Sequence, residues 1–348
     1  MLSQGVFNTL AQNGTSIYDN NAAIIKGNGT DLNNGKALKG RAKRKMITQK
    51  MSLSLIDVCN KNGTTERKQA YWNTYHCQNK IVSLDGKLYG NYCKNRFCTL
   101  CCSIRKAELI NKYLPELKKW EKPFFVTLTI KAFPLHILHK AIDKIMKAFA
   151  RICAKYKKRS QRGKDIRLVG IKSLESNFNS LTKTYNPYLH LIVQSESMAD
   201  ILIKEWLQIF TTDKDKKYAL IQAQNKRPVK DRERDLIEII KYGSKIFTEP
   251  DAKNKLRQKG NAKIYTAALE NIFRAMKGIR IFERFGFNLP KENKATTGAR
   301  LVTGHNEWQF DPKQFDWVNS ENDNKLTNYT PDPKLIELLE NRIDRELE

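Results

Sequence analysis

No apolar run in this chain approaches the roughly 18–20 residues that a membrane-spanning helix needs, which excludes an integral membrane protein. The opening residues, MLSQGVFNTLAQNG, lack a basic segment followed by an apolar one, so we expect no secretion signal and a cytoplasmic location. The glycine-rich loops GxGxxG and GxxxxGK[ST] are missing as well. Their absence argues against Rossmann and P-loop domains and predicts no nucleotide cofactor.

Acidic residues are scarce, with 36 Asp and Glu against 63 Lys and Arg in 348 residues and a formal net charge of +27. Such an excess indicates a polyanionic partner, most often nucleic acid, although solubility alone is the alternative. Basic residues concentrate near 39–45, 155–167 and 225–234. The candidate DNA-binding residues are Lys43, Arg44, Lys45, Lys157, Lys158, Arg159, Arg162, Lys226 and Arg227.

Four segments differ in composition and periodicity. Residues 1–50 are rich in Asn and Gly and predict a disordered basic arm; a cysteine-containing segment and connecting helix follow over 51–121. The main domain is expected over 122–287, and a C-terminal tail with an acidic helix over 288–348. Within these segments the patterns predict strands at 124–130, 167–175, 187–193 and 218–222 and helices at 105–120, 135–158, 198–209, 231–247 and 263–277. The fold class is therefore α+β, with a largely antiparallel central sheet.

Seven cysteines, most of them crowded into 77–102, favour metal binding over a disulfide framework. The spacing Cys-x15-Cys-x4-Cys-x2-Cys can close a tetrahedron around Zn²⁺, and a site saturated by four thiolates serves structure rather than catalysis. His76 is an alternative to the first cysteine. The predicted zinc ligands are Cys77, Cys93, Cys98 and Cys101.

Two further patterns carry chemistry. In the strand NPYLHLIV, alternation places His190 on one face, and a neighbouring strand could present Glu175 beside it, a pair suited to Mg²⁺ or Mn²⁺. In DLIEIIKYGSK, Glu238, Tyr242 and Lys245 share one side of a helix opposite an apolar stripe. A tyrosinate can attack a phosphodiester, and a lysine beside it can lower its pKa. A structural histidine and an exposed tyrosine are the plainer interpretations.

Taken in order, these pieces resemble the plasmid rolling-circle replication initiators of the HUH endonuclease superfamily. The resemblance covers about 77–286, through motifs that include YCKNRFCTLC, FFVTLTI, GIKSLESNFN, YNPYLHLIV, EIIKYGSK and ALENIFRAMKGIRIFERFG. It implies a five-stranded antiparallel sheet with helices packed over it, preceded by the cysteine-rich zinc-binding segment, and makes 122–287 the nicking domain.

The resemblance also implies roles for individual residues. Tyr242 matches the nucleophile, Glu238 a family acid that could activate a water or strand end at termination, and Lys245 a family lysine. His190 matches the second histidine of the His-hydrophobic-His motif, and Glu175 an acidic metal ligand on the preceding strand. Tyr188 stands where the first histidine is expected, and a neutral phenol is a poor ligand for Mg²⁺ or Mn²⁺. Water, Asn186 or Asn179 could then complete the site.

The implied function is binding of the double-stranded plasmid origin and nicking of an extruded single strand. The product is a 5′-phosphotyrosyl enzyme with a free 3′-OH that primes rolling-circle replication. Host helicase and DNA polymerase are the implied partners, with no membrane partner, and a homodimer stays open. The alternatives are a conjugative relaxase, a nicking-deficient zinc-containing DNA-binding protein and, least supported, a tyrosine recombinase.

Overall fold

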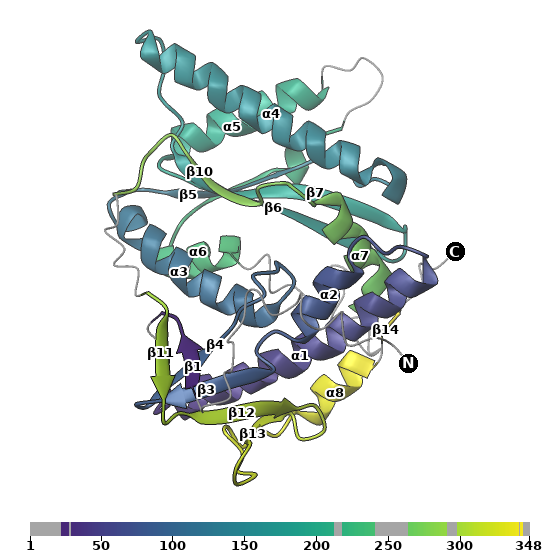
Figure 1. Ribbon diagram of the computed structural model, residues 1–348. Helices are drawn as coiled ribbons and strands as arrows, with labels where there is room; N and C mark the ends of the chain where they lie inside the picture. The colour runs from purple at the N-terminus through teal and green to yellow at the C-terminus, as the bar shows by residue number, and fades with distance from the viewer. Residues whose placement is uncertain are drawn as a thin grey trace. The chain divides into compact units, whose positions relative to one another are not determined.

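The computed structural model describes residues 22–27, 29–211, 218–240, 264–290, 298–340 and 342–343 (Figure 1). The chain forms two compact units. Unit 1 comprises Met1–Cys102 with Lys291–Glu340, and unit 2 comprises Ser103–Pro290 with Asn341–Glu348. No described helix is long and apolar enough to cross a membrane. The predicted mixture of helices and antiparallel sheets is confirmed.

Unit 1 is built on a five-stranded antiparallel sheet in the order β13-β12-β3-β4-β2, accompanied by the two-stranded pair β1-β11. Its strands are β1 (Ala22–Ile25), β2 (Thr30–Asp31), β3 (Lys80–Leu84), β4 (Lys87–Gly90), β11 (Arg300–Thr303), β12 (Asn306–Asp311) and β13 (Asp316–Asn319). Its helices are α1 (Gly35–Lys61), α2 (Lys68–Tyr75), α8 (Pro333–Glu340) and the first residues of α3 (Thr99–Lys118).

The disordered arm predicted over residues 1–50 is wrong for the part that the structure describes. This part contains β1, β2 and the first half of α1. The Asn34 side chain caps α1 by accepting a hydrogen bond from the Ala37 backbone N–H at 3.0 Å. Polar residues such as Thr48 and Gln49 are buried in α1 together with the apolar ones. The helix therefore lacks the clean apolar stripe by which a sequence pattern reveals a helix.

The separate C-terminal tail predicted over 288–348 is also wrong. Strands β11, β12 and β13 belong to unit 1, where β12 pairs directly with β3 and places Asn306 opposite Ser83. Phe310 and Trp317 are buried against Leu38 and Ile81, so this late segment completes the core of unit 1. The boundary between the units falls inside α3, after Cys102. Helix α8 agrees with the predicted terminal helix as far as Glu340.

Unit 2 contains a second five-stranded antiparallel sheet, in the order β10-β6-β7-β5-β8. Its strands are β5 (Phe124–Thr129), β6 (Gly170–Asn179), β7 (Thr184–Val193), β8 (Asn225–Pro228) and β10 (Phe282–Phe285), with β9 (Ile264–Tyr265) and β14 (Arg342–Ile343) as a separate parallel pair. Its helices are α4 (Leu135–Gln161), α5 (Glu196–Thr211), α6 (Arg232–Ile240), α7 (Thr266–Ala275) and the remainder of α3.

Helices cover both faces of this sheet. Figure 1 shows α4 and α5 on one side and α3 and α6 on the other. Side chains alternate accordingly: Val126 and Leu191 join the core beneath α4 and α5, whereas Phe125 and Ile192 join the core beneath α3 and α6. The second face is the one on which the predicted metal-binding residues lie.

Two local predictions differ from the structure. Residues 218–222 form no strand; the segment ends in a short 3₁₀ helix at Ile221–Ala223, and the fifth strand is β8. The Gln224 side chain instead accepts a hydrogen bond from the Thr129 backbone N–H at 2.9 Å, which closes the end of β5. The predicted helix at 231–247 is confirmed over Arg232–Ile240, and its remainder lies outside the described residues.

Candidate functional site

The strand alternation brings His190 and Glu175 together, as the sequence predicts. In the β6–β7 ladder His190 lies opposite Ser173, and Tyr188 lies opposite Glu175. The His190 Nδ1 atom is 3.3 Å from Glu175 Oε1, and the Glu175 side chain is only 1% exposed. This buried nitrogen and oxygen are suitable first donors for a divalent cation.

Tyr188 is bound to the same carboxylate. Its hydroxyl donates to Glu175 Oε2 at 2.8 Å and lies 3.4 Å from Asn177 Oδ1. Burial, followed by the charge of Glu175, raises the pKa of Tyr188 well above its ordinary value. The phenol therefore stays protonated and acts as a hydrogen-bond donor to Glu175 rather than as an anionic ligand.

The residues considered as additional oxygen donors have structural partners. Asn179 Oδ1 accepts from the Leu181 backbone N–H at 2.9 Å in the β6–β7 turn. Asn186 donates to the Ile130 carbonyl at 2.7 Å and accepts from the Thr129 hydroxyl. Asn177 was not among the predicted donors, although the same period-two alternation that selected Glu175 places it on this face.

Helix α6 packs over this face of the sheet through its apolar stripe. Leu236 and Ile239 are buried against Phe125, Ile171 and Ile192, so the apolar stripe opposite Glu238 is the side of the helix that packs on the sheet. The charge of Glu238 contributes to raising the pKa of Tyr188, so Glu238 lies on the side of α6 that is nearer to Tyr188. Tyr242 and Lys245 lie outside the described residues.

Unit 1 carries the cluster that could hold a metal ion. The Sγ atoms of Cys77, Cys93, Cys98 and Cys101 all lie within 4.8 Å of one another. Cys101 Sγ is 3.7 Å from Cys77 Sγ and 3.6 Å from Cys93 Sγ. A tetrahedron with Zn–S distances of about 2.3 Å requires sulfur atoms about 3.8 Å apart. The four sulfurs therefore fit Zn²⁺, and Cys77 rather than His76 supplies the fourth donor.

Backbone N–H groups support these sulfurs. Lys94 adopts a left-handed conformation, with φ of 58°, which directs its N–H to Cys101 Sγ at 3.3 Å. Hydrogen bonds from Cys101 and Cys77 lower the pKa of the Cys93 thiol, whereas hydrogen bonding to Cys101 raises the pKa of the Cys77 thiol. A divalent cation binds thiolates, so its binding would release the thiol protons. Cys102 stands apart, and its thiol donates to the Arg96 carbonyl at 3.0 Å.

Lys45, predicted to bind DNA, is instead buried beside the cysteine cluster. Its ammonium donates to the Cys77 carbonyl at 2.7 Å, to the Tyr75 carbonyl at 2.8 Å and to Asn79 Oδ1. Burial lowers the pKa of Lys45 to about 7, although the negative charges of Cys77, Cys98 and Cys93 act in the opposite direction and raise it. The DNA-binding prediction for Lys45 is therefore wrong, because the side chain is fully buried and its ammonium holds the backbone carbonyls of Tyr75 and Cys77.

Replacing Lys45 with methionine is expected to weaken Zn²⁺ binding by about 10–100-fold, the usual effect of losing a group that orients metal ligands. Competition with a chromogenic chelator measures this affinity. Lys43→Met is the control, because Lys43 is exposed two residues earlier on the same helix. Equal Zn²⁺ affinities in the two folded variants would contradict the role of Lys45.

The remaining basic candidates fall into two groups. Arg159 pairs with Asp165 at 2.9 Å, Lys226 with Asp200 at 2.6 Å, and Arg227 with Asp235 at 2.9 Å, so internal ion pairs engage these three. Exposed side chains without an acidic partner among the described residues are Lys43, Lys157, Lys158 and Arg162, whereas Arg44 is partly buried.

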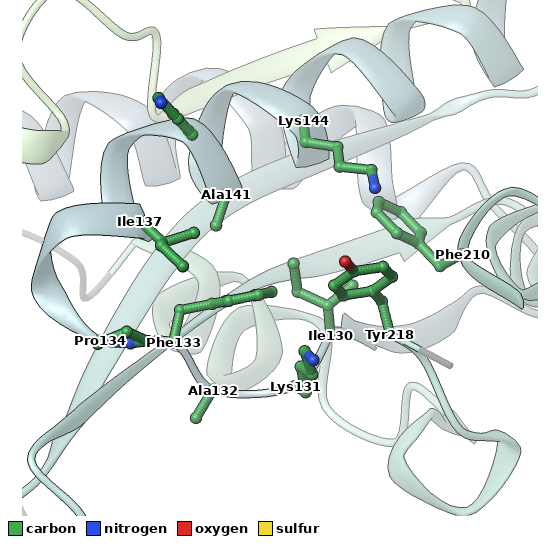
Figure 2. A pocket seen from close by; sticks show the side chains of 11 residues that line it. Ile130, Lys131, Ala132, Phe133, Pro134, Ile137, Ala141, Lys144, Phe210 and Tyr218 are labelled. Atoms are coloured by element: carbon green, nitrogen blue, oxygen red, sulfur yellow. The ribbon is translucent and has the colours of Figure 1, made fainter. Parts of the chain in front are cut away.

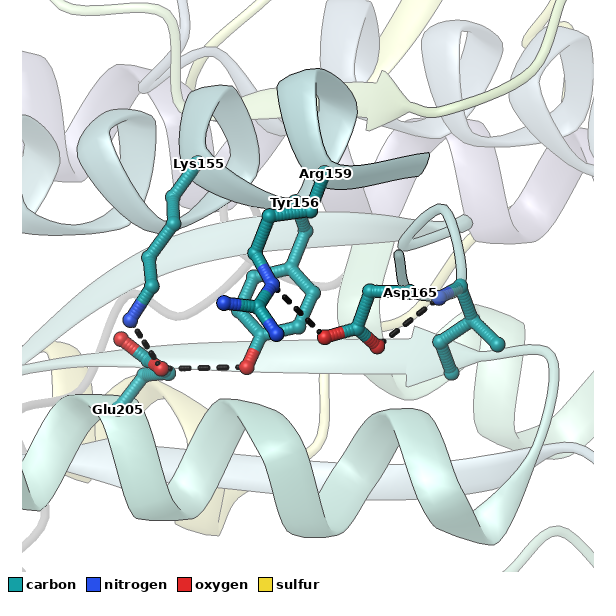
Figure 3. A network of polar contacts seen from close by, with 6 residues as sticks. Lys155, Tyr156, Arg159, Asp165 and Glu205 are labelled. Carbon is teal, nitrogen blue, oxygen red and sulfur yellow. Dashed lines mark hydrogen bonds and ion pairs between the residues drawn. The ribbon is translucent and has the colours of Figure 1, made fainter. Parts of the chain in front are cut away.

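Some polar side chains at the basic C-terminal end of α4 bind the neighbouring helix α5. Figure 3 shows Lys155 and Tyr156 directed at Glu205 of α5, with the Lys155 ammonium 2.6 Å and the Tyr156 hydroxyl 3.1 Å from Glu205 Oε1. Burial and the Glu205 charge raise the pKa of Tyr156 to about 12. This end of α4 therefore combines a fixed polar network with the outward-facing basic residues.

Together these features define an α+β protein in which His190 and Glu175 meet on the sheet face that α6 covers, and in which a separate four-cysteine cluster could hold a metal ion. The model of the replication protein family matches residues 87–328, more than two thirds of the chain. The chain therefore belongs to the replication protein family, and its resemblance to plasmid replication initiators is confirmed.

Two curated proteins are similar to this chain. One, named Protein rep, from Staphylococcus aureus, is 27% identical over 169 residues, covering 46% of this chain and 72% of that protein. Another Protein rep, from Streptococcus pneumoniae serotype 2, is 27% identical over 120 residues, covering 32% of this chain and 35% of that protein. No solved structure gives a significant match.

Proposed function

We propose that this chain initiates rolling-circle replication by nicking one strand of a plasmid origin, with Tyr242 as the nucleophile and an HUH-type nicking domain in unit 2. The observation that carries the proposal is the buried contact between His190 and Glu175 beneath α6, at 3.3 Å. The apolar stripe of α6 rests on this sheet face, and Tyr242 follows Glu238 by four residues in the sequence. Membership of the replication protein family supports the same assignment.

His190 and Glu175 would hold Mg²⁺ or Mn²⁺, which supplies positive charge to the scissile phosphate when bound. Tyr242 attacks that phosphorus in line: the phenolic oxygen forms the new O–P bond, and the bond to the 3′ oxygen breaks. The tyrosine proton leaves with solvent or a base, and the departing 3′ oxygen takes up a proton. Lys245 favours the tyrosinate, and Glu238 activates the water or strand end that resolves the intermediate at termination.

The four-cysteine cluster would hold Zn²⁺ as a structural ion, because four sulfur ligands leave no open coordination position. Double-stranded origin DNA would contact the exposed basic residues Lys43, Lys157, Lys158 and Arg162, and Arg44, which follows Lys43 in the chain. Such phosphate contacts weaken steeply with salt. The free 3′-OH would then serve host helicase and DNA polymerase, and a homodimer of this chain could assemble on the origin.

A covalent-adduct assay tests the nicking proposal. The protein is incubated with Mn²⁺ and supercoiled DNA of its replicon, then denatured and examined for protein attached to nicked DNA. We expect an adduct with the native sequence and none with Tyr242→Phe, which keeps the ring and removes the nucleophilic oxygen. An adduct of equal yield in Tyr242→Phe would refute the assignment of the nucleophile.

A second candidate is a DNA-binding protein of the same family that does not nick. The observation that favours it is the 2.8 Å hydrogen bond from Tyr188 to Glu175, which occupies one carboxylate oxygen at the expected metal site. Origin binding without any adduct in Mn²⁺ would support this alternative. Recovery of the adduct by Tyr188→His would then identify the missing histidine as the cause.

A further inference from the structure

A pocket of about 360 Å³ lies at the end of β5, on the face of the sheet beneath α4 and α5. Aromatic rings and lysines meet in it, as Figure 2 shows. Its rings are Phe133, Phe210 and Tyr218, and its lysines are Lys131, Lys140 and Lys144. Its size is within the usual range for small-ligand sites, about 300–1,000 Å³.

The pocket is held rigidly at its aromatic centre. The Tyr218 backbone accepts from the Lys131 N–H at 2.7 Å and donates to the Phe210 carbonyl at 3.0 Å, so this residue is tied both to the end of β5 and to α5. The rings of Phe133 and Tyr218 are inclined by 24° with centroids 6.1 Å apart. Tyr218 is only half-buried, so its ring is a fixed platform that a ligand can reach.

Two of the three lysines lie over this ring. The Lys144 ammonium lies 4.4 Å and the Lys131 ammonium 4.5 Å from the Tyr218 ring centroid. No acidic side chain among the described residues forms an ion pair with either lysine or with Lys140. Cation–π contacts at exposed sites are weak, and lysine stems are flexible, so the ammonium groups can move to a phosphate at little cost.

We propose that this pocket binds one unpaired nucleotide of a single strand, with its base against Tyr218 and its phosphate between the lysines. Aromatic rings beside cations are the usual means of binding single-stranded nucleic acid, because every base has a face that stacks. A carboxylate-bearing peptide would use the lysines but not the ring. The flat ring and the cationic groups together therefore favour a nucleotide.

The position of the pocket relates it to the nicking site, and in this respect the inference rests on the proposed function. Thr129 is the ladder partner of Tyr188, and the pocket begins at the next residue, Ile130. Successive residues in a strand are about 3.3 Å apart and point to opposite faces. A DNA single strand bound in the pocket would therefore pass around the end of β5 toward His190 and Glu175.

The test is fluorescence anisotropy with a labelled thymidine oligonucleotide of about 12 residues, within the site sizes of such surfaces. All variants carry Tyr242→Phe and are measured without Mn²⁺, so that no covalent adduct contributes. Tyr218→Leu is expected to weaken binding about 5- to 150-fold, the effect of losing one stacked base. Tyr218→Phe, which keeps the ring, is expected to bind as the parent does.

The lysine arm uses Lys131→Gln with Lys144→Gln. If both contact phosphate, the slope of log affinity against log salt falls by about 1.4 for a single strand. The control is Lys119→Gln with Lys147→Gln, which removes the same charge from exposed positions paired with Glu116 and Asp143. Equal effects of the two pairs, or unchanged binding in Tyr218→Leu, would overturn the proposal.

Thymidine monophosphate, titrated alone, distinguishes a free nucleotide from a nucleotide within a strand. If the affinity for the monophosphate depends on Tyr218 and the affinity for the oligonucleotide does not, the pocket binds a free nucleotide. That result would refute the binding of a DNA strand. A chain that forms no covalent adduct but binds the oligonucleotide through Tyr218 would refute nicking and leave the pocket standing. A chain that forms the covalent adduct but binds the oligonucleotide equally well without Tyr218 would refute only the pocket.

Discussion

Replacing His190 with alanine is expected to lower Mn²⁺-dependent nicking at least a hundredfold while leaving double-stranded origin binding unchanged. The imidazole is 15% exposed, and its Nδ1 lies 3.3 Å from Glu175 Oε1, so the substitution removes one of the two adjacent donors. Charge stabilisation by a divalent cation contributes several kcal/mol to such reactions, and each ~1.4 kcal/mol is a factor of ten in rate. Nicking of supercoiled plasmid over a Mn²⁺ titration measures the loss.

Two further variants show whether the loss is specific to the metal-binding residues. Glu175→Gln keeps an oxygen to accept the Tyr188 hydrogen bond but removes the negative charge, so it is expected to lose Mn²⁺ affinity as His190→Ala does. Ser173→Ala is the control, because Ser173 is the ladder partner of His190 and its buried hydroxyl makes no hydrogen bond in the described part of the chain. Native nicking rates in His190→Ala would refute the assignment of this face.

Replacing Cys98 and Cys101 together with serine is expected to eliminate bound Zn²⁺ and to lower the melting temperature of unit 1 by ~8–16 °C. A metal present at a thousand times its dissociation constant stabilises the folded state by ~4 kcal/mol. Each kcal/mol shifts the melting temperature by ~2–4 °C in a unit of this size. Elemental analysis and thermal unfolding measure the two effects, and a strong chelator should reproduce the second in the native sequence.

Cys102→Ser is the matched control for that experiment. Cys102 adjoins Cys101 but donates to the Arg96 carbonyl, a hydrogen bond that a serine hydroxyl can also form. We expect this variant to retain Zn²⁺ and its melting temperature. Full Zn²⁺ content in the Cys98 and Cys101 double variant would show that these sulfurs are not ligands.

Local patterns predicted the parts of the site that depend on nearest neighbours. Strand alternation placed Glu175 beside His190, because two paired strands with period two bring side chains of one face together. Cysteine spacing selected the same four sulfurs that the structure gathers within 4.8 Å of one another. The helical period likewise predicted an apolar stripe opposite Glu238, and in α6 that stripe packs on the sheet.

Other features were hidden because they arise from packing. Lys45 reads as part of a basic surface run, yet its ammonium is surrounded by the carbonyls of Tyr75 and Cys77. Helix α1 is buried on much of its surface, so its residues show no clean amphipathic period. Tyr218, in a segment predicted as a strand, instead forms the centre of an aromatic and basic pocket.

Periodicity, motif spacing and family resemblance were sufficient to predict the α+β class, the antiparallel strands, the family and the residue types of two metal-capable groups. Three features became visible only in the folded chain: β12 pairs with β3, Lys45 supports the cysteine cluster, and Tyr188 donates to Glu175. The difference lies in how far apart the interacting residues are in the chain. Periodicity and spacing report contacts among residues near in the chain, whereas burial and hydrogen bonding depend on partners that folding brings from distant segments.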